Sequence, residues 1–302
     1  MEKFCVKNKK FGTYPSIFHH PGRIGDGNRI LGIVQLKKMF FDHIAGDLEN
    51  GYFYDDKEKI RLKMPTLNMS VNTEVSDKLT VVFVSNLKEI GSGPRSLDYF
   101  GIPYCILGSQ VNKWSNGLKI KFLNDELPNI TTKYFMLLDS SDTFVINDLS
   151  RAIEIFEASN CEILLNAGQR FWPHWIDEMK EYRSFCDQIG DEVKSCHRYV
   201  NTGALIAKTE FYREIAKTFD VDEAPLPGDD QAAFYPLYKK YYPRIQLDYH
   251  CKIFQCEFDE ELLIESSVLP WYRKQLMHSK TPFYLVLRKY AAMRRSQHKT
   301  HV

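Results

Sequence analysis

The chain has 302 residues, of which 44% are hydrophobic and 14% aromatic, and it carries 40 Lys and Arg against 39 Asp and Glu. This composition supplies a substantial core and excludes an intrinsically disordered chain. The formal net charge of +1 argues against a protein that coats nucleic acid with its whole surface. No apolar run approaches the roughly 18 residues that span a bilayer, and the first residues lack the apolar stretch of a secretory signal. We therefore expect a cytoplasmic protein.

Apolar runs alternate with helical patterns along most of the chain, which predicts an α/β fold with a mostly parallel central sheet flanked by helices. Residues 1–77 form an N-terminal extension of unclear role, in which only a helix at 31–45 is readable. A single domain is expected over residues 78–285, followed by a basic tail at 286–302. The expected strands are 79–84, 103–107, 134–138, 162–165, 204–207 and 245–248, and the expected helices are 119–127, 149–159, 211–219 and 230–241.

Basic residues gather at the C-terminal end, where residues 266–302 contain eight Lys or Arg and no Asp or Glu. This end could bind an anionic partner such as a phosphate, a nucleic acid or a membrane surface; the alternative is a solvated tail. The seven Cys are scattered, without the spacing of a metal site. Cys186 and Cys196 flank an expected loop and would pair only in an oxidising compartment.

The expected strand 134–138 stops at Asp139-Ser140-Ser141-Asp142. Mg²⁺ and Mn²⁺ take one or two carboxylates together with substrate phosphates, so this carboxylate pair predicts a metal site at the end of a strand. Ligands of α/β sheets also bind at the carboxyl ends of the strands. The alternative is that Asp139 or Asp142 caps the helix expected at 149–159.

Four further motifs follow in order. They are Phe171-Trp172-Pro173, Asn201-Thr202-Gly203-Ala204, Asp229-Asp230-Gln231 and the segment 247–255. Together with Asp139-Ser140-Ser141-Asp142 they resemble the N-terminal glycosyltransferase domain of procollagen lysyl hydroxylases and the related collagen glycosyltransferases. The resemblance covers about residues 79–280. It implies a GT-A fold and a metal-dependent transfer of a hexose from a nucleotide-sugar, UDP-linked in that family, to an acceptor hydroxyl.

The resemblance also implies a metal site. Asp139 and Asp142 would hold Mn²⁺ or Mg²⁺ with the diphosphate of the UDP-sugar. A late His completes this site in the family, and His278 occupies the matching position, with Lys280 beside it to contact the diphosphate. His19 or His20, in an N-terminal motif of similar type, is the alternative ligand.

Other site residues follow from the resemblance in the same way. Ser85 and Asn86 would contact the ribose and base, Lys119 the nucleotide or its phosphates, and Asn201 would lie in the donor site. Trp172 and Trp175 would form an aromatic wall for a sugar, or else pack in the core. Asp229 and Asp230 are the catalytic candidates, because a carboxylate there could bind sugar hydroxyls or deprotonate the acceptor. Asp229 could also cap a helix.

The acceptor is left open between a glycan, a protein hydroxyl and a modified nucleobase. The oxygenase domain of the collagen-modifying enzymes has no counterpart in this sequence, so we expect a free-standing transferase, microbial or viral, acting in the host cytoplasm if viral. Ser141 replaces the aromatic residue that stacks on the donor base in the family. The alternatives are a non-catalytic glycan- or nucleic-acid-binding protein on the same fold, and a metal-dependent phosphohydrolase or nucleotidyltransferase.

Overall fold

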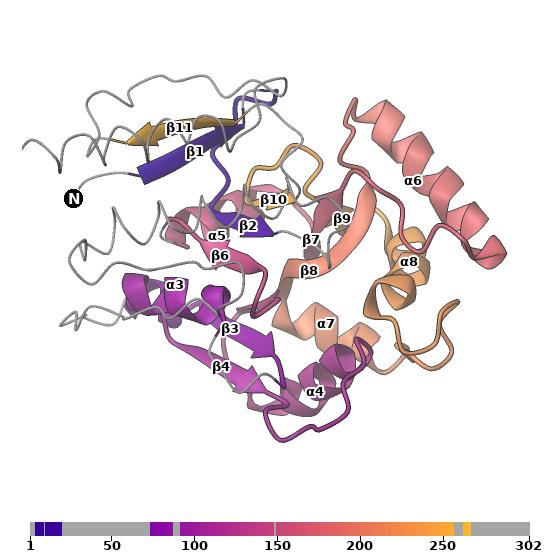
Figure 1. Cartoon of the computed structure of the whole chain (residues 1–302), viewed down its shortest axis with the longest axis horizontal. Coiled ribbons are helices and arrows are strands. Elements are labelled where there is room, and N and C mark those ends of the chain that lie inside the picture. Colours follow the sequence, from indigo (N-terminus) through magenta and orange to yellow (C-terminus); the bar gives the residue numbers. More distant parts are fainter. Residues whose placement is uncertain are drawn as a thin grey trace, which may run out of the picture. The chain divides into compact units, whose positions relative to one another are not determined.

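The structure of the protein is a computed structural model that describes residues 4–8, 10–19, 73–86, 91–147, 149–256 and 262–266. These residues belong to two compact units. One unit contains the antiparallel pair β1 (Phe4–Asn8) and β11 (Leu262–Ser266). The other contains the remaining elements, including residues 15–19 (Figure 1). The helix expected at 31–45 lies outside the described residues, as do His20, His278, Lys280 and the basic C-terminal end.

A mixed sheet of six strands forms the centre of the larger unit, in the order β4-β3-β5-β8-β7-β9. Strand β8 is antiparallel to both of its neighbours, and the other five strands point the same way. The α/β class and the mostly parallel sheet are therefore confirmed, whereas the reversed strand was not expected. The strands are β3 (Leu79–Val84), β4 (Tyr104–Leu107), β5 (Tyr134–Leu138), β7 (Ile163–Gly168), β8 (Tyr199–Lys208) and β9 (Ile245–Leu247).

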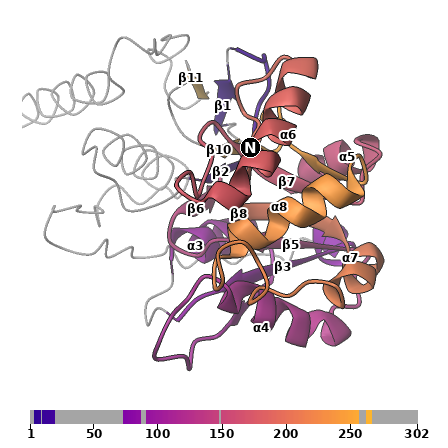
Figure 2. The same ribbon diagram turned by 90° about the vertical axis from the view of Figure 1, so that its right-hand side faces the viewer.

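Helices cover both faces of this sheet, because the buried strands alternate apolar side chains between two cores. Val82 and Leu137 face one core, and their neighbours Val81 and Met136 face the other. The first core takes side chains from α4 (Leu118–Glu126), α6 (Lys180–Glu192), α7 (Thr209–Ala216) and α8 (Asp230–Tyr241). The second takes them from α2 (Thr73–Ser76), α3 (Ser92–Phe100) and α5 (Ser150–Ala158). In Figure 2, α8 crosses in front of β8.

A second, three-stranded sheet has the order β10-β2-β6. Its strands are β2 (Ile17–His19), β6 (Thr143–Val145) and β10 (Phe254–Cys256), with β2 parallel to β10 and antiparallel to β6. Ile17 and Phe18 are fully buried. A strand from near the N-terminus is therefore the central strand of a sheet whose other strands lie more than 120 residues later in the chain.

Two local expectations were wrong. Residues 201–203 were expected as a turn before a strand, but they lie within β8, where the pairing with β7 shifts register. Such a bulge lets a long strand bend while it stays in the sheet. Cys186 lies inside α6 rather than beside a loop, and no disulfide joins it to Cys196. No helix among the described residues is long and apolar enough to cross a membrane.

Candidate metal centre and its surroundings

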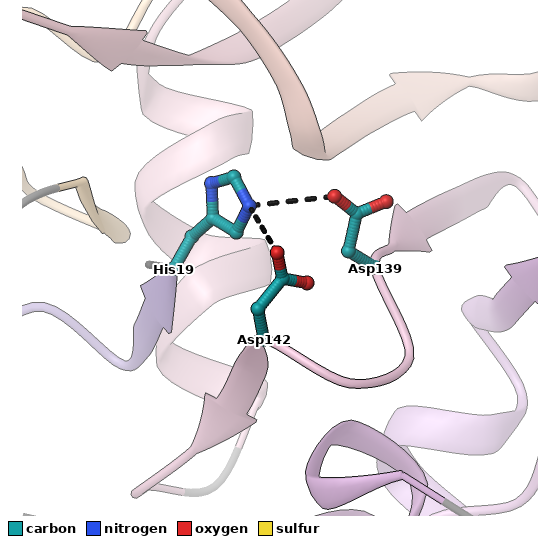
Figure 3. Close-up of side chains that lie close together, drawn as sticks. All are labelled: His19, Asp139 and Asp142. Carbon is teal, nitrogen blue, oxygen red and sulfur yellow. Dashed lines mark ion pairs between the residues drawn. The ribbon is translucent and has the colours of Figure 1, made fainter. Parts of the chain in front are cut away.

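Three side chains from two distant parts of the chain converge at the end of β5 (Figure 3). His19 Nε2 lies 3.3 Å from Asp139 Oδ2 and 3.7 Å from Asp142 Oδ2. One nitrogen or oxygen from each of the three residues lies within 4.8 Å of the others, a spacing that could hold a metal ion. An imidazole with two carboxylates suits a cation such as Mn²⁺, which accepts nitrogen and oxygen ligands.

The strand register explains why these residues meet. Asp139 follows the last residue of β5, and Asp142 precedes β6. His19, the last residue of β2, is paired with Thr143, the residue after Asp142. The sequence left His19 open as an alternative ligand, and the structure brings it to the carboxylate pair. Neither Asp139 nor Asp142 caps α5, whose N-cap is Leu149.

The His19 ring is held from two sides. Its Nδ1 lies 3.2 Å from Asn166 Nδ2, and a Cβ at Gly203 would lie only 2.1–2.2 Å from the ring. The β8 bulge therefore makes room for the ring, with glycine at the point of closest approach. The same bulge places Asn201 Oδ1 3.1 Å from Asn166 Nδ2 and 3.1 Å from the Gly203 N–H, which it accepts. Asn201 thus helps to position Asn166, the residue that contacts the His19 ring.

His19 Nε2 is buried and lies within ion-pair distance of two carboxylates, but it makes a hydrogen bond to neither of them. A buried polar atom normally has a partner, and one without it requires an explanation. A metal ion between Nε2 and the two carboxylates would provide that partner. Ligation by Nε2 needs the ring proton on Nδ1, the ring nitrogen that lies beside the Asn166 amide.

The turn between the two aspartates is fixed by contacts with α3. Ser92 Oγ donates to the carbonyls of Ser141 and Thr143, at 2.8 and 2.7 Å. The Gly93 N–H donates to the Ser140 carbonyl at 3.0 Å, and Thr143 Oγ1 donates to the Asp139 carbonyl. A carboxylate pair on such a braced turn is already arranged for a ligand, which lowers the entropy cost of binding.

Lys119 joins this centre to the start of α8. Its Nζ lies 2.8 Å from Asp139 Oδ1 and 2.9 Å from Asp230 Oδ2, and Thr202 Oγ1 donates to the same Asp230 oxygen at 2.8 Å. Asp139 therefore offers Oδ1 to Lys119 and Oδ2 to His19. Lys119 and Asp230 are both buried, so each charge needs the other as its partner.

The ionisation of the centre follows from these contacts. Burial by itself raises the pKa of Asp139, but the Lys119 ammonium and His19 outweigh it, so this pKa lies well below its usual value. Burial lowers the pKa of Lys119, yet Asp139 and Asp230 raise it above its usual value. Burial also lowers the pKa of His19, and the facing carboxylates raise it well above 6.5. Without a metal, His19 is thus a bound cation.

These shifts predict a pH-dependent stability for the metal-free chain. The stabilisation from protonated His19 is complete below its ordinary pKa of 6.5 and is lost as pH rises through the raised pKa of the folded chain. Thermal unfolding in EDTA should therefore show a Tm that falls as the pH rises above about 6.5. His19→Gln should remove that slope. With excess Mn²⁺ the stabilisation should instead grow with pH, because the metal needs the neutral ring. A slope that persists in His19→Gln would assign it to another group.

The two catalytic candidates have different surroundings. Asp229 is the N-cap of α8 and accepts the Ala232 N–H at 2.8 Å, so the expected capping role is confirmed. Burial is the main cause that raises the pKa of Asp229. Asp230 is almost fully buried and is paired with Lys119. Asp230 consequently belongs to the network beside the candidate metal centre.

The expected nucleoside contacts lie on the β3 side of the sheet. Ser85 and Asn86 directly follow β3. The Ser85 N–H donates to the Leu107 carbonyl at 2.9 Å, and Asn86 Nδ2 donates to the Val111 carbonyl at 3.2 Å. Both residues therefore also fix the chain after β4. Trp172, by contrast, follows β7 on the other side of the sheet and is exposed, so it is not a core residue.

Asp248, a buried residue of the segment 247–255, has a structural role. The Asp248 carboxylate accepts the N–H groups of Lys252, Ile253 and Phe254 at 2.7–2.9 Å. It thereby shapes the turn that leads into β10, the strand beside β2. Asp248 holds in place the small sheet that carries His19.

Comparisons with known proteins add no relative: no protein-family model matches the chain, and a search of curated proteins gives no match.

Proposed function

We propose that the chain is a metal-dependent glycosyltransferase that moves a hexose from a nucleotide-sugar, UDP-linked by resemblance, to an acceptor hydroxyl. The observation that carries the proposal is the buried His19 Nε2, which lies within ion-pair distance of Asp139 and Asp142 but makes a hydrogen bond to neither. The order of the sequence motifs that resemble procollagen lysyl hydroxylase glycosyltransferase domains supports it. The GT-A fold is part of the proposal, and the mixed six-stranded sheet is compatible with it.

In this proposal His19, Asp139 and Asp142 hold Mn²⁺ or Mg²⁺. A cation bound there would supply positive charge against the diphosphate leaving group. Lys119 keeps Asp139 ionised and oriented, because its ammonium contacts Asp139 Oδ1 and leaves Oδ2 facing His19. Ser85 and Asn86 bind the nucleoside, on the β3 side. The cytoplasm remains the expected compartment, and Lys280 and the basic end remain candidates for anionic contacts.

Asp229 is the better candidate for the base. The Asp230 carboxylate forms an ion pair with Lys119 and accepts a hydrogen bond from Thr202. These contacts suit a carboxylate that binds and orients a neighbouring group better than one that accepts a proton. Asp229 is less buried, and its pKa is raised, which brings it closer to the range in which a carboxylate accepts a proton effectively. We assign Asp229 to the acceptor hydroxyl and Asp230 to the donor sugar.

The test is a panel of nucleotide-sugars incubated with the purified chain and Mn²⁺ without an acceptor, scoring free nucleoside diphosphate and free sugar. We expect slow cleavage of one donor that stops in EDTA. Asp142→Asn should lower the rate at least about 100-fold, since charge stabilisation of the leaving group is worth several kcal/mol. Asp125→Asn, at an exposed position of α4, is the matched control and should leave the rate unchanged.

Three results would contradict the proposal in different ways. Release of inorganic phosphate without free sugar would indicate a phosphohydrolase. Formation of a nucleoside triphosphate and sugar 1-phosphate when pyrophosphate is added to the same mixture would indicate a nucleotidyltransferase. No release, together with no thermal stabilisation by any donor with Mn²⁺, would favour the non-catalytic binding protein.

A further inference from the structure

Two indole rings form an exposed aromatic surface beyond the end of β7. Trp172 is 45% exposed and Trp175 is 54% exposed, and they are the only large hydrophobic side chains of the described residues that are exposed. Their ring centroids lie 4.3 Å apart with an interplanar angle of 87°. In this edge-to-face arrangement the edge of one ring covers the face of the other, which leaves apolar ring surface open to solvent.

The aromatic pair is anchored, so it does not depend on a partner to become ordered. Pro173, between the two indoles in sequence, is buried, and the Trp172 carbonyl accepts Gln231 Nε2 at 3.3 Å. Rigid, exposed tryptophans lose little conformational entropy when a ligand binds them, which is why they are frequent in binding sites.

The same anchor places the pair next to the proposed donor site. Gln231 follows Asp230 in the first turn of α8, and the Asp230 carboxylate reaches Asp139 through Lys119. Along the sheet, β3 and β7 lie on opposite sides of the β5–β8 pair (Figure 1). Since Ser85 and Asn86 follow β3 and the indoles follow β7, the indoles lie across the metal centre from the nucleoside side. They are therefore on the side where an acceptor would enter.

The charge around the indoles selects the kind of acceptor. Residues 170–180 carry Asp177 and Glu178 against Arg170 and Lys180, and Lys180 Nζ lies 3.0 Å from Asp177 Oδ1, so the charges beside the indoles balance. Nucleic acids and anionic lipids bind through basic side chains that neutralise phosphates. A sugar ring, by contrast, presents an apolar C–H face that packs on an aromatic ring and hydroxyl groups that donate to carboxylates. The chemistry fits a neutral glycan and disfavours a polyanion.

We propose that Trp172 and Trp175 bind a sugar ring of a neutral glycan, and that this glycan is the acceptor. That the glycan is the acceptor rests on the proposed transferase function. Glycan binding by the two indoles can be tested without metal or donor. Of the three acceptor classes left open by the sequence, a glycan, a protein hydroxyl and a nucleobase, this proposal selects the glycan. The acceptor would be an oligosaccharide or polysaccharide without phosphate or sulfate groups.

The experiment measures binding of the full chain, in EDTA, to an array of neutral oligosaccharides that also carries heparin fragments and single-stranded DNA. We expect binding to at least one class of neutral glycan. Titration of that glycan should then show affinity lowered at least about fivefold in Trp175→Ala, the factor that corresponds to about 1 kcal/mol of aromatic contact. Trp175→Phe, which keeps an aromatic ring, should recover part of it, and the exposed Lys217→Ala should bind as the wild type does.

Several outcomes would overturn this inference. They are wild-type binding to no neutral glycan, glycan binding that Trp172→Ala and Trp175→Ala leave unchanged, and Trp175-dependent binding to DNA instead. Unchanged thermal unfolding of the variants, expected because both side chains are exposed, excludes misfolding as the cause. Because EDTA removes the metal, a failure here leaves the donor assay untouched. A failure of that assay in turn leaves glycan binding measurable.

Discussion

His19→Gln is expected to lower the affinity for Mn²⁺ at least about 100-fold, because it removes one of the three proposed protein ligands, and even loss of an outer-shell partner costs about 10- to 100-fold. Isothermal titration of Mn²⁺ into the metal-free chain measures this directly. Gln is close to His in size and can still hydrogen bond with Asn166, so the substitution is chosen to keep the small sheet intact. Circular dichroism and thermal unfolding check that it does.

The control is the other candidate histidine. His278→Gln should leave the Mn²⁺ affinity as it is in the wild type, since Asp139 and Asp142 already have His19 as their third partner. The reverse pattern, in which His278→Gln abolishes binding and His19→Gln does not, would move the third ligand to the C-terminal region, as the family resemblance implied.

Gly203→Ala is expected to damage both stability and metal binding. Its Cβ would lie 2.1 Å from His19 Cε1 and 2.2 Å from Nε2, distances that no packing tolerates, so the ring or the β8 bulge must move. Overpacking of this kind costs about 1–3 kcal/mol. We expect chemical denaturation to show that loss and Mn²⁺ titration to show weaker binding.

Gly168→Ala is the matched control, because it adds the same methyl group to a buried glycine at the end of β7 with no atom closer than 3.7 Å. It should change stability and Mn²⁺ affinity far less. A further test is the double variant. If the clash with His19 causes the damage, His19→Ala should cost less stability in the Gly203→Ala background than alone. Additive effects would contradict the proposed clash.

Sequence patterns predicted the central elements well where local chemistry is strong. Leu79–Val84 and Tyr134–Leu138 are continuous apolar runs, and each forms a strand with those bounds. The helix Asp230–Tyr241 was also expected with its bounds, because Asp229 supplies a clear N-cap. Burial on both faces and capping are local properties, so a single sequence reveals them.

Other elements gave no such signal. Strand β2 has only three residues, too few for a period of two to show. Helix α3 contains Gly93 and Pro94 in its first turn and was not expected. Helix α6 is mostly polar, and its buried residues are few, Cys186 and Ile189 among them, so little apolar sequence marks it. The bulge at Asn201 depends on pairing with β7, a tertiary contact.

The cluster of His19, Asp139 and Asp142 was predicted in part, for the same reason. Asp139 and Asp142 are neighbours in sequence, so their pairing at a strand end could be read directly. Their third partner depends on which strand lies beside β6, and that is set by strand pairing across more than 120 residues. Lys119 was expected to reach the donor phosphates, whereas in the structure its ammonium already bridges Asp139 and Asp230. Sequence spacing does not reveal that contact.

The most direct measurement of the central claim is pulsed electron paramagnetic resonance of Mn²⁺ bound to the chain in the presence of UDP. The account predicts a ¹⁴N coupling from an imidazole and a ³¹P coupling from the diphosphate in the wild type, with the ¹⁴N coupling lost in His19→Gln. Mn²⁺ that shows no ³¹P coupling, or an imidazole coupling that survives in His19→Gln, would contradict a nucleotide-binding metal centre built on His19, Asp139 and Asp142.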